Sequence, residues 1–255
     1  MANPESGDRE FLPCVPASDT RPAVEADPEL PDYLVRHYAK AYLWPSAVWF
    51  FDHQAIINAI LFGQYRAIMA AVLGLIDAEP AGRTLQITAV YGELTPQLAE
   101  RIPDLHLIDV AEVQLQATRR KLAASGGRVQ MQRMNCEQLA YPAGSFDTAL
   151  MFMLLHELPS AARRHSLREA IRVLTPGGRL VIAEYGELGT SHLFHRLAPM
   201  RRLLEFAEPF LGGFWREDLA GSLAEYCREA GRSLHCEAKL EIFGGFYRAL
   251  AFRIT

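Results

Sequence analysis

The sequence has few cysteines, and none of them is spaced for pairing. The four cysteines, Cys14, Cys136, Cys227 and Cys236, form no Cys-x-x-Cys pair. This spacing argues against a zinc knuckle or a disulfide framework and suits a reducing cytoplasm. The chain also lacks an apolar stretch of the ~18 residues that a spanning helix needs, and a basic region followed by an apolar run at its start. We therefore expect no spanning helix and no secretory signal.

An excess of positive charge is absent as well. The 255 residues carry a formal net charge of -4 and an isoelectric point near 6.1. Such a chain has no general basic field, which excludes a nucleic acid partner held mainly through its phosphates. Short basic clusters at residues 119–121, 163–164 and 201–202 are interpreted as solvated helix faces.

Composition divides the chain into three parts. Residues 1–29 hold five prolines among acidic and small residues and are predicted to be a disordered tail. Residues 30–80 show helical spacing of apolar side chains and are predicted to form a helical cap over the active site. The cap is dense in aromatics, which either pack onto the sheet or cover an apolar substrate or a membrane surface: Tyr33, Tyr38, Tyr42, Trp44, Trp49, Phe50 and Phe51.

Residues 81–255 alternate between strand and helix patterns. Strands are predicted at residues 84–90, 105–110, 129–133, 148–155 and 180–185, with a turn at Pro176-Gly177-Gly178 and a closing hairpin over residues 234–254 around Gly244-Gly245. This order predicts an α/β fold with a doubly wound parallel sheet and a C-terminal antiparallel hairpin. Ligands of such sheets bind at the carboxyl ends of the strands.

Asp109 stands at one of these strand ends. A carboxylate there, ~20 residues after the first strand, accepts hydrogen bonds from both ribose hydroxyls of an adenosine. The same residue could instead cap the helix that begins near Glu112. Asp109 alone does not separate a nicotinamide cofactor from S-adenosylmethionine (SAM).

Two segments make that choice. Residues 135–147, which begin at Asn135 and end in Ser-Phe-Asp, and residues 172–182, Arg-Val-Leu-Thr-Pro-Gly-Gly-Arg-Leu-Val-Ile, resemble class I SAM-dependent methyltransferases. The resemblance implies that Asn135 binds the adenine amino group. Where that family has a glycine-rich loop, this chain has Val90-Tyr-Gly-Glu-Leu-Thr95, with Gly92 alone. Either the site has decayed into a non-catalytic binder, or SAM is held in a shifted pose.

A narrower resemblance covers residues 31–210. The runs Val90-Tyr-Gly-Glu-Leu-Thr95 and Leu154-Leu-His-Glu157 are similar to the rhodoquinone-biosynthesis family RquA. This similarity implies that SAM donates its amine to the ring of ubiquinone, assisted by a divalent metal ion such as Mn²⁺. Together the two resemblances imply a SAM site at Val90, Tyr91, Gly92, Thr95, Asp109, Val110, Gln114, Asn135, Cys136 and Leu154.

Catalytic roles are expected at His156, Glu157 and Tyr185, and metal ligation at His156, Glu157 and Glu184. Imidazole and carboxylate suit Mn²⁺. His156 is equally consistent with a general base or an ordinary loop residue. The family's Asp-Tyr-His after the fifth strand is here Glu184-Tyr185-Gly186, so a histidine is missing.

Three functions follow from these patterns. The first is amination of ubiquinone to rhodoquinone, the second is conventional methyl transfer to a quinone or another apolar small molecule, and the third is non-catalytic SAM binding. We expect a cytoplasmic protein with a small-molecule quinone substrate. An isoprenoid quinone implies peripheral contact with the inner membrane face through the aromatic helices. The sequence leaves the oligomeric state open.

Overall fold

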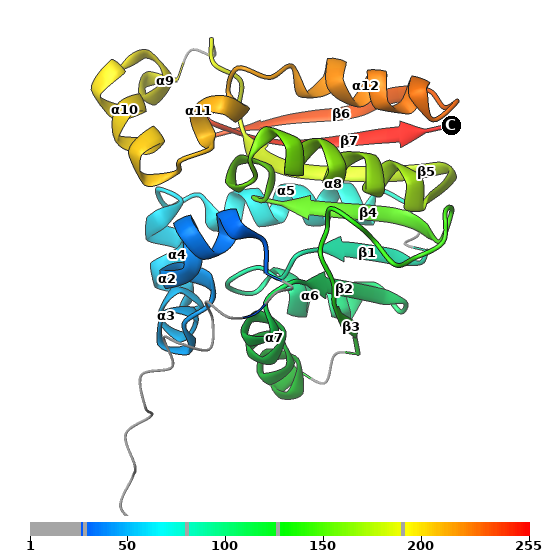
Figure 1. Cartoon of the computed structure of the whole chain (residues 1–255), viewed down its shortest axis with the longest axis horizontal. Helices are drawn as coiled ribbons and strands as arrows, with labels where there is room; N and C mark the ends of the chain where they lie inside the picture. Colours follow the sequence, from blue (N-terminus) through cyan, green and yellow to red (C-terminus); the bar gives the residue numbers. More distant parts are fainter. Residues whose placement is uncertain (1–26, 28–29, 80–81, 126–127, 190–191) are drawn as a thin grey trace, which may run out of the picture.

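The sheet has seven strands in the order β3-β2-β1-β4-β5-β7-β6 (Figure 1). A computed structural model describes residues 27, 30–79, 82–125, 128–189 and 192–255. Within them the strands are β1 (Thr84–Ile87), β2 (Leu105–Asp109), β3 (Gln130–Arg133), β4 (Phe146–Phe152), β5 (Leu174–Tyr185), β6 (Leu234–Ile242) and β7 (Tyr247–Ile254). The predicted disordered tail lies outside the described residues, apart from Asp27.

The first five strands are parallel, and the last two form an antiparallel hairpin against β5. β1 pairs with β2 on one side and with β4 on the other, so the strand order reverses at β1. A ligand site is expected in the crevice at such a reversal. This is the class I methyltransferase-like sheet with a C-terminal hairpin that the sequence predicted.

Helices cover both faces of the sheet (Figure 1). All four residues of β1 are buried, as in a central parallel strand with both faces covered. α5 (Tyr65–Asp77) packs against β5 and β7, while α8 (Ser160–Val173) packs against β5 and α12 (Leu219–Glu229). α6 (Leu94–Arg101) packs between α5 and α7 (Glu112–Ser125).

The N-terminal segment forms four short helical pieces before α5. They are the π-helix η1 (Leu34–Tyr38), α2 (Ala39–Tyr42), α3 (Pro45–Phe51) and α4 (Gln54–Ile60). The chain after Pro45 forms two helices, α3 and α4, because it turns at Asp52 and His53, where the backbone of His53 is extended. Pro45 occupies the first turn of α3, where a missing N–H costs nothing.

A second group of short helices follows β5. α9 (Leu193–Arg196), α10 (Ala198–Ala207) and α11 (Leu211–Phe214) lie beside the N-terminal helices, at the end of the molecule to which the parallel strands point (Figure 1). Ring contacts join the two groups, including Phe62 with Phe194 at a centroid distance of 4.9 Å. Two chain segments far apart in sequence therefore meet at the carboxyl edge of the sheet.

Several predicted strand limits were wrong. β1 ends at Ile87 and β4 at Phe152, three residues earlier than predicted in each case. The residue that follows each strand leaves the extended conformation: Thr88 has a φ of 73° and Met153 a φ of 51°. The predicted turn at Pro176-Gly177-Gly178 falls within the bounds of β5, at an irregularity of that strand. Phe146 of β4 pairs with Leu174 and Thr148 with Arg179, so the extra residues lie on β5, and Gly177 has a φ of 82°. Bulges of this kind accommodate extra residues without ending the strand.

No single helix of the described residues is long and apolar enough to cross a membrane. The pair α4 and α5 passes that test only when the two are taken together, and they are bent by 94° at their junction.

Candidate active site

A cavity opens at the carboxyl ends of β1, β2 and β4, beneath the N-terminal helices. It has an empty volume of about 1160 Å³, including the part that is open to solvent. Its lining combines strand-end residues with aromatic and aliphatic side chains of the N-terminal segment, among them Tyr33, Tyr38, Tyr42, Ile60 and Tyr65.

Asp109 ends β2 and lines the cavity. Its two carboxylate oxygens accept the backbone N–H groups of Ala89, at 2.9 Å, and Ala111, at 2.8 Å. Burial raises the pKa of Asp109 to about 6, and these two hydrogen bonds oppose the rise. The residue thus holds the loops after β1 and β2 together and keeps a carboxylate at the position where a ribose is bound in this type of sheet.

The loop after β1 begins with a strained residue. Thr88 has a φ of 73°, which is rare for a β-branched side chain, and its carbonyl accepts a hydrogen bond from Nε2 of Gln86 at 3.0 Å. Gln86 also exchanges hydrogen bonds with the hydroxyl of Thr95. Thr95 is fully buried and lies outside the cavity lining, because its hydroxyl closes the base of the loop.

Backbone N–H groups of the loop are bonded to side chains of the chain itself. The N–H of Gly92 donates to Oδ1 of Asp52 at 2.9 Å, and those of Glu93 and Leu94 donate to the hydroxyl of Tyr65. Gly92 has a φ of 78°, and a Cβ there would lie 2.6 Å from the Tyr65 hydroxyl oxygen. Glycine is therefore required at residue 92 for the close approach of Tyr65. Gly92 does not line the cavity.

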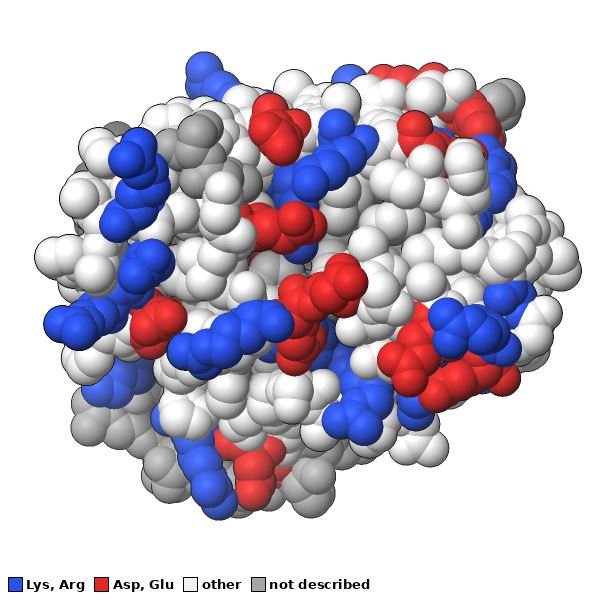
Figure 2. Space-filling view, turned by 90° about the horizontal axis from the view of Figure 1, so that it is seen from above, with Lys and Arg blue, Asp and Glu red and all other residues white. Residues whose placement is uncertain are grey.

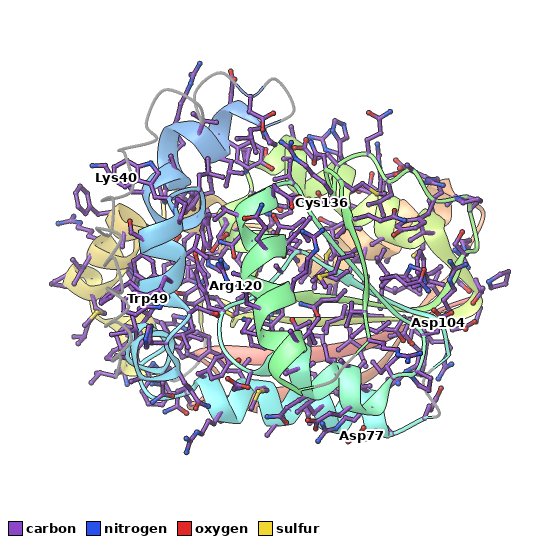
Figure 3. All side chains as sticks on the ribbon, turned by 90° about the horizontal axis from the view of Figure 1, so that it is seen from below. Lys40, Trp49, Asp77, Asp104, Arg120 and Cys136 are labelled. Carbon is purple, nitrogen blue, oxygen red and sulfur yellow. The ribbon has the colours of Figure 1, made fainter. Side chains whose placement is uncertain are left out.

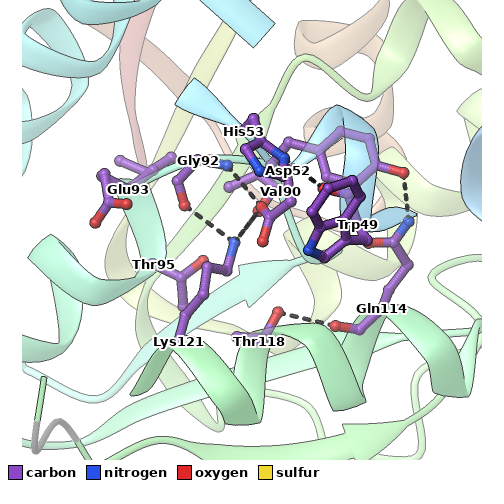
Figure 4. Close-up of polar contacts among 12 residues, drawn as sticks. Trp49, Asp52, His53, Val90, Gly92, Glu93, Thr95, Gln114, Thr118 and Lys121 are labelled. Carbon is purple, nitrogen blue, oxygen red and sulfur yellow. Dashed lines mark hydrogen bonds and ion pairs between the residues drawn. The ribbon is translucent and has the colours of Figure 1, made fainter. Parts of the chain in front are cut away.

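Lys121 of α7 closes this network (Figure 4). Its ammonium group donates to Oδ1 of Asp52 at 2.7 Å and to the carbonyls of Val90 and Gly92 at 3.1 and 3.0 Å. Three acceptors match the three N–H donors of lysine. The loop without the usual glycines is thus fully supported by α7 and the N-terminal helices.

Tyr91 fills the space that a glycine would leave open. Its ring stacks on Tyr42 with a centroid distance of 5.6 Å and an interplanar angle of 9°. The hydroxyl donates to the carbonyl of Ala41 at 2.6 Å and accepts from Nε2 of Gln114 at 2.9 Å. Tyr91 therefore joins the loop to the cap and to α7 while its side chain lines the cavity.

His156 and Glu157 lie in a 3₁₀ turn, η2 (Leu155–Glu157), beyond the end of β4. Adjacent residues of a strand point to opposite faces, but in this turn both side chains line the cavity. Nδ1 of His156 lies 2.7 Å from Oε1 of Glu184, and Nε2 lies 4.0 Å from Oε1 of Glu157. The turn thus brings an imidazole and a carboxyl group to one wall of the site.

The pKa values of this pair are shifted upward. Burial by itself would lower the pKa of His156, but the charge and hydrogen bond of Glu184 outweigh burial and raise it to about 9. Burial raises the pKa of Glu157 to about 8, although the charge of His156 opposes that rise. At neutral pH His156 is therefore an imidazolium. Perturbed pKa values in a cleft are typical of functional groups.

The predicted metal site is not assembled. Glu184 is fully buried, lies outside the cavity lining and uses its oxygens on the imidazole of His156 and on the backbone N–H groups of His156 and Tyr185. Among the residues that the structure describes, no group of three potential ligands is placed to hold a metal ion. Glu184, which was predicted as a ligand, instead supports the imidazole of His156 from behind the cavity wall.

The remaining predicted residues lie on the wall of the cavity. Val90, Val110, Gln114, Asn135, Cys136, Leu154 and Tyr185 all line it. Oδ1 of Asn135 accepts the N–H of Glu137 at 2.9 Å. Burial raises the pKa of Cys136 to about 12, so its thiol stays neutral. The ring of Tyr185 packs edge-on against His156 with a centroid distance of 4.8 Å.

The position of the missing histidine is closed by backbone. A Cβ on Gly186 would lie 1.8 Å from the carbonyl oxygen of Gly245, and the N–H of Gly186 donates to the carbonyl of Phe246 at 2.7 Å. A side chain at residue 186 would therefore displace the turn between β6 and β7. The absence of histidine is built into the packing of this hairpin.

Sequence reasoning missed the residues that connect the cap to the site. Each of three cap tyrosines donates its hydroxyl to one carboxylate: Tyr33 to Glu137, Tyr38 to Glu208 and Tyr42 to Glu157. Asp52, Tyr65 and Lys121 lie in the stretches of family resemblance, which was the available signal. Glu208, which follows α10, carried no signal because only the fold brings it to Tyr38.

Comparison with known proteins starts from a family model. Residues 85–178 match the family described as "Methyltransferase domain". The chain is 30% identical over 148 residues to a ubiquinone/menaquinone biosynthesis C-methyltransferase of Geotalea daltonii, covering 54% of this chain and 62% of that protein. It is 32% identical over 148 residues to a demethylmenaquinone methyltransferase of Thermus thermophilus, covering 56% and 62%. The chain thus spans about three fifths of these curated relatives.

Solved structures with low sequence identity share the fold. The PH0226 protein of Pyrococcus horikoshii has a TM-score of 0.59 at 13% identity, covering 89% of this chain and all of that one. The [4+2]-cyclase SpnF has a TM-score of 0.54 at 17% identity, covering 83% and 96%. Because a protein named as a cyclase shares the fold, the fold alone does not decide the reaction. Residues 85–178 therefore match a methyltransferase domain, and the solved structures show that the chain shares their fold.

Proposed function

We propose that this chain is a SAM-dependent methyltransferase that acts on the ring of a quinol. The observation that carries the proposal is one cavity with Asp109 on one wall and the His156–Glu184 pair on another, beneath apolar side chains of the cap. The similarity to proteins named as ubiquinone/menaquinone C-methyltransferases supports a quinone-type substrate. The apolar part of the lining suits a ring with a hydrocarbon tail.

The residues present fit SAM and have separable roles. Asp109 accepts hydrogen bonds from the ribose hydroxyls, and Asn135 lies where the adenine is expected. SAM supplies an electrophilic methyl group when it is bound. The ionised form of Glu157 would take the hydroxyl proton of the quinol, and the resulting anion makes the neighbouring ring carbon nucleophilic. Nε2–H of the His156 imidazolium would donate to that ring oxygen and hold it in place, and the proton of the methylated ring carbon would leave to solvent. Glu184 accepts a hydrogen bond from Nδ1–H of the imidazolium and raises the pKa of His156, which keeps the proton on Nε2.

The loop after β1 favours a second candidate, amination of ubiquinone to rhodoquinone with SAM as amino donor. Three loop N–H groups that would otherwise be free to approach the methionine part of SAM are bonded to Asp52 and Tyr65. A changed environment for that part of SAM agrees with the resemblance to the RquA family. This candidate needs no different binding site for the quinone.

One experiment separates the two candidates. The purified chain is incubated with short-chain quinones and quinols and with SAM that carries one isotope in the methyl group and another in the α-amino group. Methyl transfer predicts a heavier quinone with the methyl label. Exchange of methoxy for amine predicts a lighter quinone with the nitrogen label. A product with neither label, or no product with any quinone or quinol, would contradict both proposals.

A further inference from the structure

Exposed large hydrophobic side chains are concentrated in two short segments. Of the ten found among the described residues, nine lie within residues 49–62 and 188–206, and the tenth is Leu240. The most exposed are Phe206 at 85%, Trp49 at 66% and Leu203 at 60%. We call these nine residues the apolar rim: Trp49, Phe50, Ile60, Phe62, Leu188, Leu193, Leu197, Leu203 and Phe206. Concentration on this scale marks an interaction surface.

The two segments lie at one end of the molecule. α3 and α4 carry the first part of the rim, α9 and α10 carry the second, and both lie at the end to which the parallel strands point (Figure 1). Phe62 of the first part contacts Phe194 next to Leu193 in the second. Ile60 is 46% exposed and also lines the active-site cavity. The rim is therefore continuous with the opening of that cavity.

The charge around the rim is positive. Residues 49–66 and 188–206 contain four arginines, Arg66, Arg196, Arg201 and Arg202, and two acids, Glu205 and Asp52, the latter paired with Lys121. Arg66, Arg196 and Arg202 are exposed, and within the described part of the chain none of the three is in an ion pair. Figure 2 shows several Lys and Arg side chains at the end of the molecule that carries α9 and α10. Lys40 is exposed near Trp49 at the same end (Figure 3).

We propose that the apolar rim docks this protein onto an anionic phospholipid bilayer. Aromatic and leucine side chains enter the boundary between headgroups and acyl chains, while the flanking arginines lie among phosphates. The second segment, α9 and α10, contributes as much as the N-terminal helices. Docking places Ile60 and the cavity opening at the membrane, so an apolar substrate passes from the bilayer to the active site without crossing water.

The charge of the rim favours a bilayer over a second copy of the chain. Pairing two rims face to face would bring Arg66, Arg196 and Arg202 of both copies together, an excess of positive charge that Glu205 of each copy offsets only in part, and like charges repel. An anionic lipid surface supplies the complementary charge. The proposal does not depend on the reaction, because binding to vesicles is measured without turnover.

Flotation of the full chain with vesicles tests the proposal. We expect binding to vesicles that contain phosphatidylglycerol and weaker binding to phosphatidylcholine alone. The double variant Leu203→Glu/Phe206→Glu should reduce binding by about tenfold or more, since two apolar anchors are lost. Arg196→Ser and Arg202→Ser should each reduce binding to the anionic vesicles by about fivefold. Leu240→Glu, which changes the exposed leucine outside the rim, should bind like the parent chain.

Two results would overturn docking. Equal flotation of the parent chain, the double variant and the Leu240→Glu control would show that the rim does not contact lipid. A parent chain that light scattering finds dimeric, and that the double variant renders monomeric, would assign the rim to self-association. Turnover of a water-soluble short-chain quinone should be equal in parent and double variant, so failure of docking is distinguishable from failure of the proposed reaction.

Discussion

The loop after β1 and the turn after β4 lie at the same edge of the sheet and differ in what their polar groups do. Each begins with a residue of positive φ directly after the strand: Thr88 follows β1 and Met153 follows β4. In the first loop the backbone N–H groups of Gly92 and Glu93 are bonded to cap side chains, and the carbonyl of Val90 accepts a hydrogen bond from Lys121 of α7. In the second, His156 and Glu157 present ionisable groups to the cavity.

The difference teaches how this site divides its tasks. The first loop is a fixed wall, supported from the cap by Asp52 and Tyr65 and from α7 by Lys121. The second carries groups whose pKa values are shifted into a useful range by Glu184 and by burial. We therefore expect changes in the first loop to affect stability and cofactor binding, and changes in the second to affect turnover.

The largest expected effect concerns His156. His156→Ala removes the donor that stabilises charge on the ring oxygen, and we expect turnover to fall by about 10²–10⁴-fold. The dissociation constant for SAM, measured by calorimetry, should change little, because Asp109 is intact. His235→Ala, at an exposed position of β6, serves as the control. If His156→Ala lost SAM binding while its turnover per SAM-bound enzyme stayed unchanged, His156 would serve cofactor binding and not turnover, contrary to the proposal.

Lys121 provides the matching test for the first loop. Lys121→Met leaves the carboxylate of Asp52 and two carbonyls without their shared donor, and the pair is largely buried, with 17% and 18% of the side chains exposed. We expect a loss of roughly 3 kcal/mol in the free energy of unfolding and weaker SAM binding. Chemical denaturation measures the first and calorimetry the second. Arg120→Met, at the exposed neighbouring position (Figure 3), should be near neutral.

Glu184 allows a test by pH. The imidazolium of His156 persists up to its pKa of about 9, so turnover should decline as pH rises through that value. Glu184→Gln removes the attraction that outweighs burial, and the decline should then move toward or below the ordinary pKa of 6.5. Glu225→Gln on the exposed face of α12 is the control. A pH profile of turnover that is identical in Glu184→Gln and the parent chain would exclude Glu184 as the residue that positions His156.

The smallest effect concerns the strained residue Thr88. Thr88→Gly relieves a β-branched side chain at a φ of 73°, and we expect a gain of about 1 kcal/mol in the free energy of unfolding. Gln116→Gly on the exposed face of α7 should instead cost about 1 kcal/mol, as glycine does within helices. Denaturant titration of both variants gives the two signs, and a loss in Thr88→Gly would mean that the threonine side chain supports the loop.

Much of the fold followed from periodicity and strand-end rules. The alternation of apolar runs with helical patterns predicted the order of elements, and Asp109 was identified because parallel strands end at one edge. Strand limits were less accurate, because Thr88 and Met153 are residues whose type does not announce a positive φ. Glu184 was predicted as a metal ligand because it lies at a strand end, where a carboxylate can serve as a ligand or as the support of a histidine from the neighbouring strand.

By itself the sequence determined the α/β class, the order of the strands along the chain and the set of strand-end residues, because these depend on local pattern and on general rules of chain connection. The tertiary structure decided which of those residues meet. Pairing of β4 with β5 placed Glu184 behind His156, 28 residues apart, and the docking of the cap onto α7 joined Asp52 to Lys121. Hydrogen bonds between distant segments depend on relative positions in space, which no local pattern specifies.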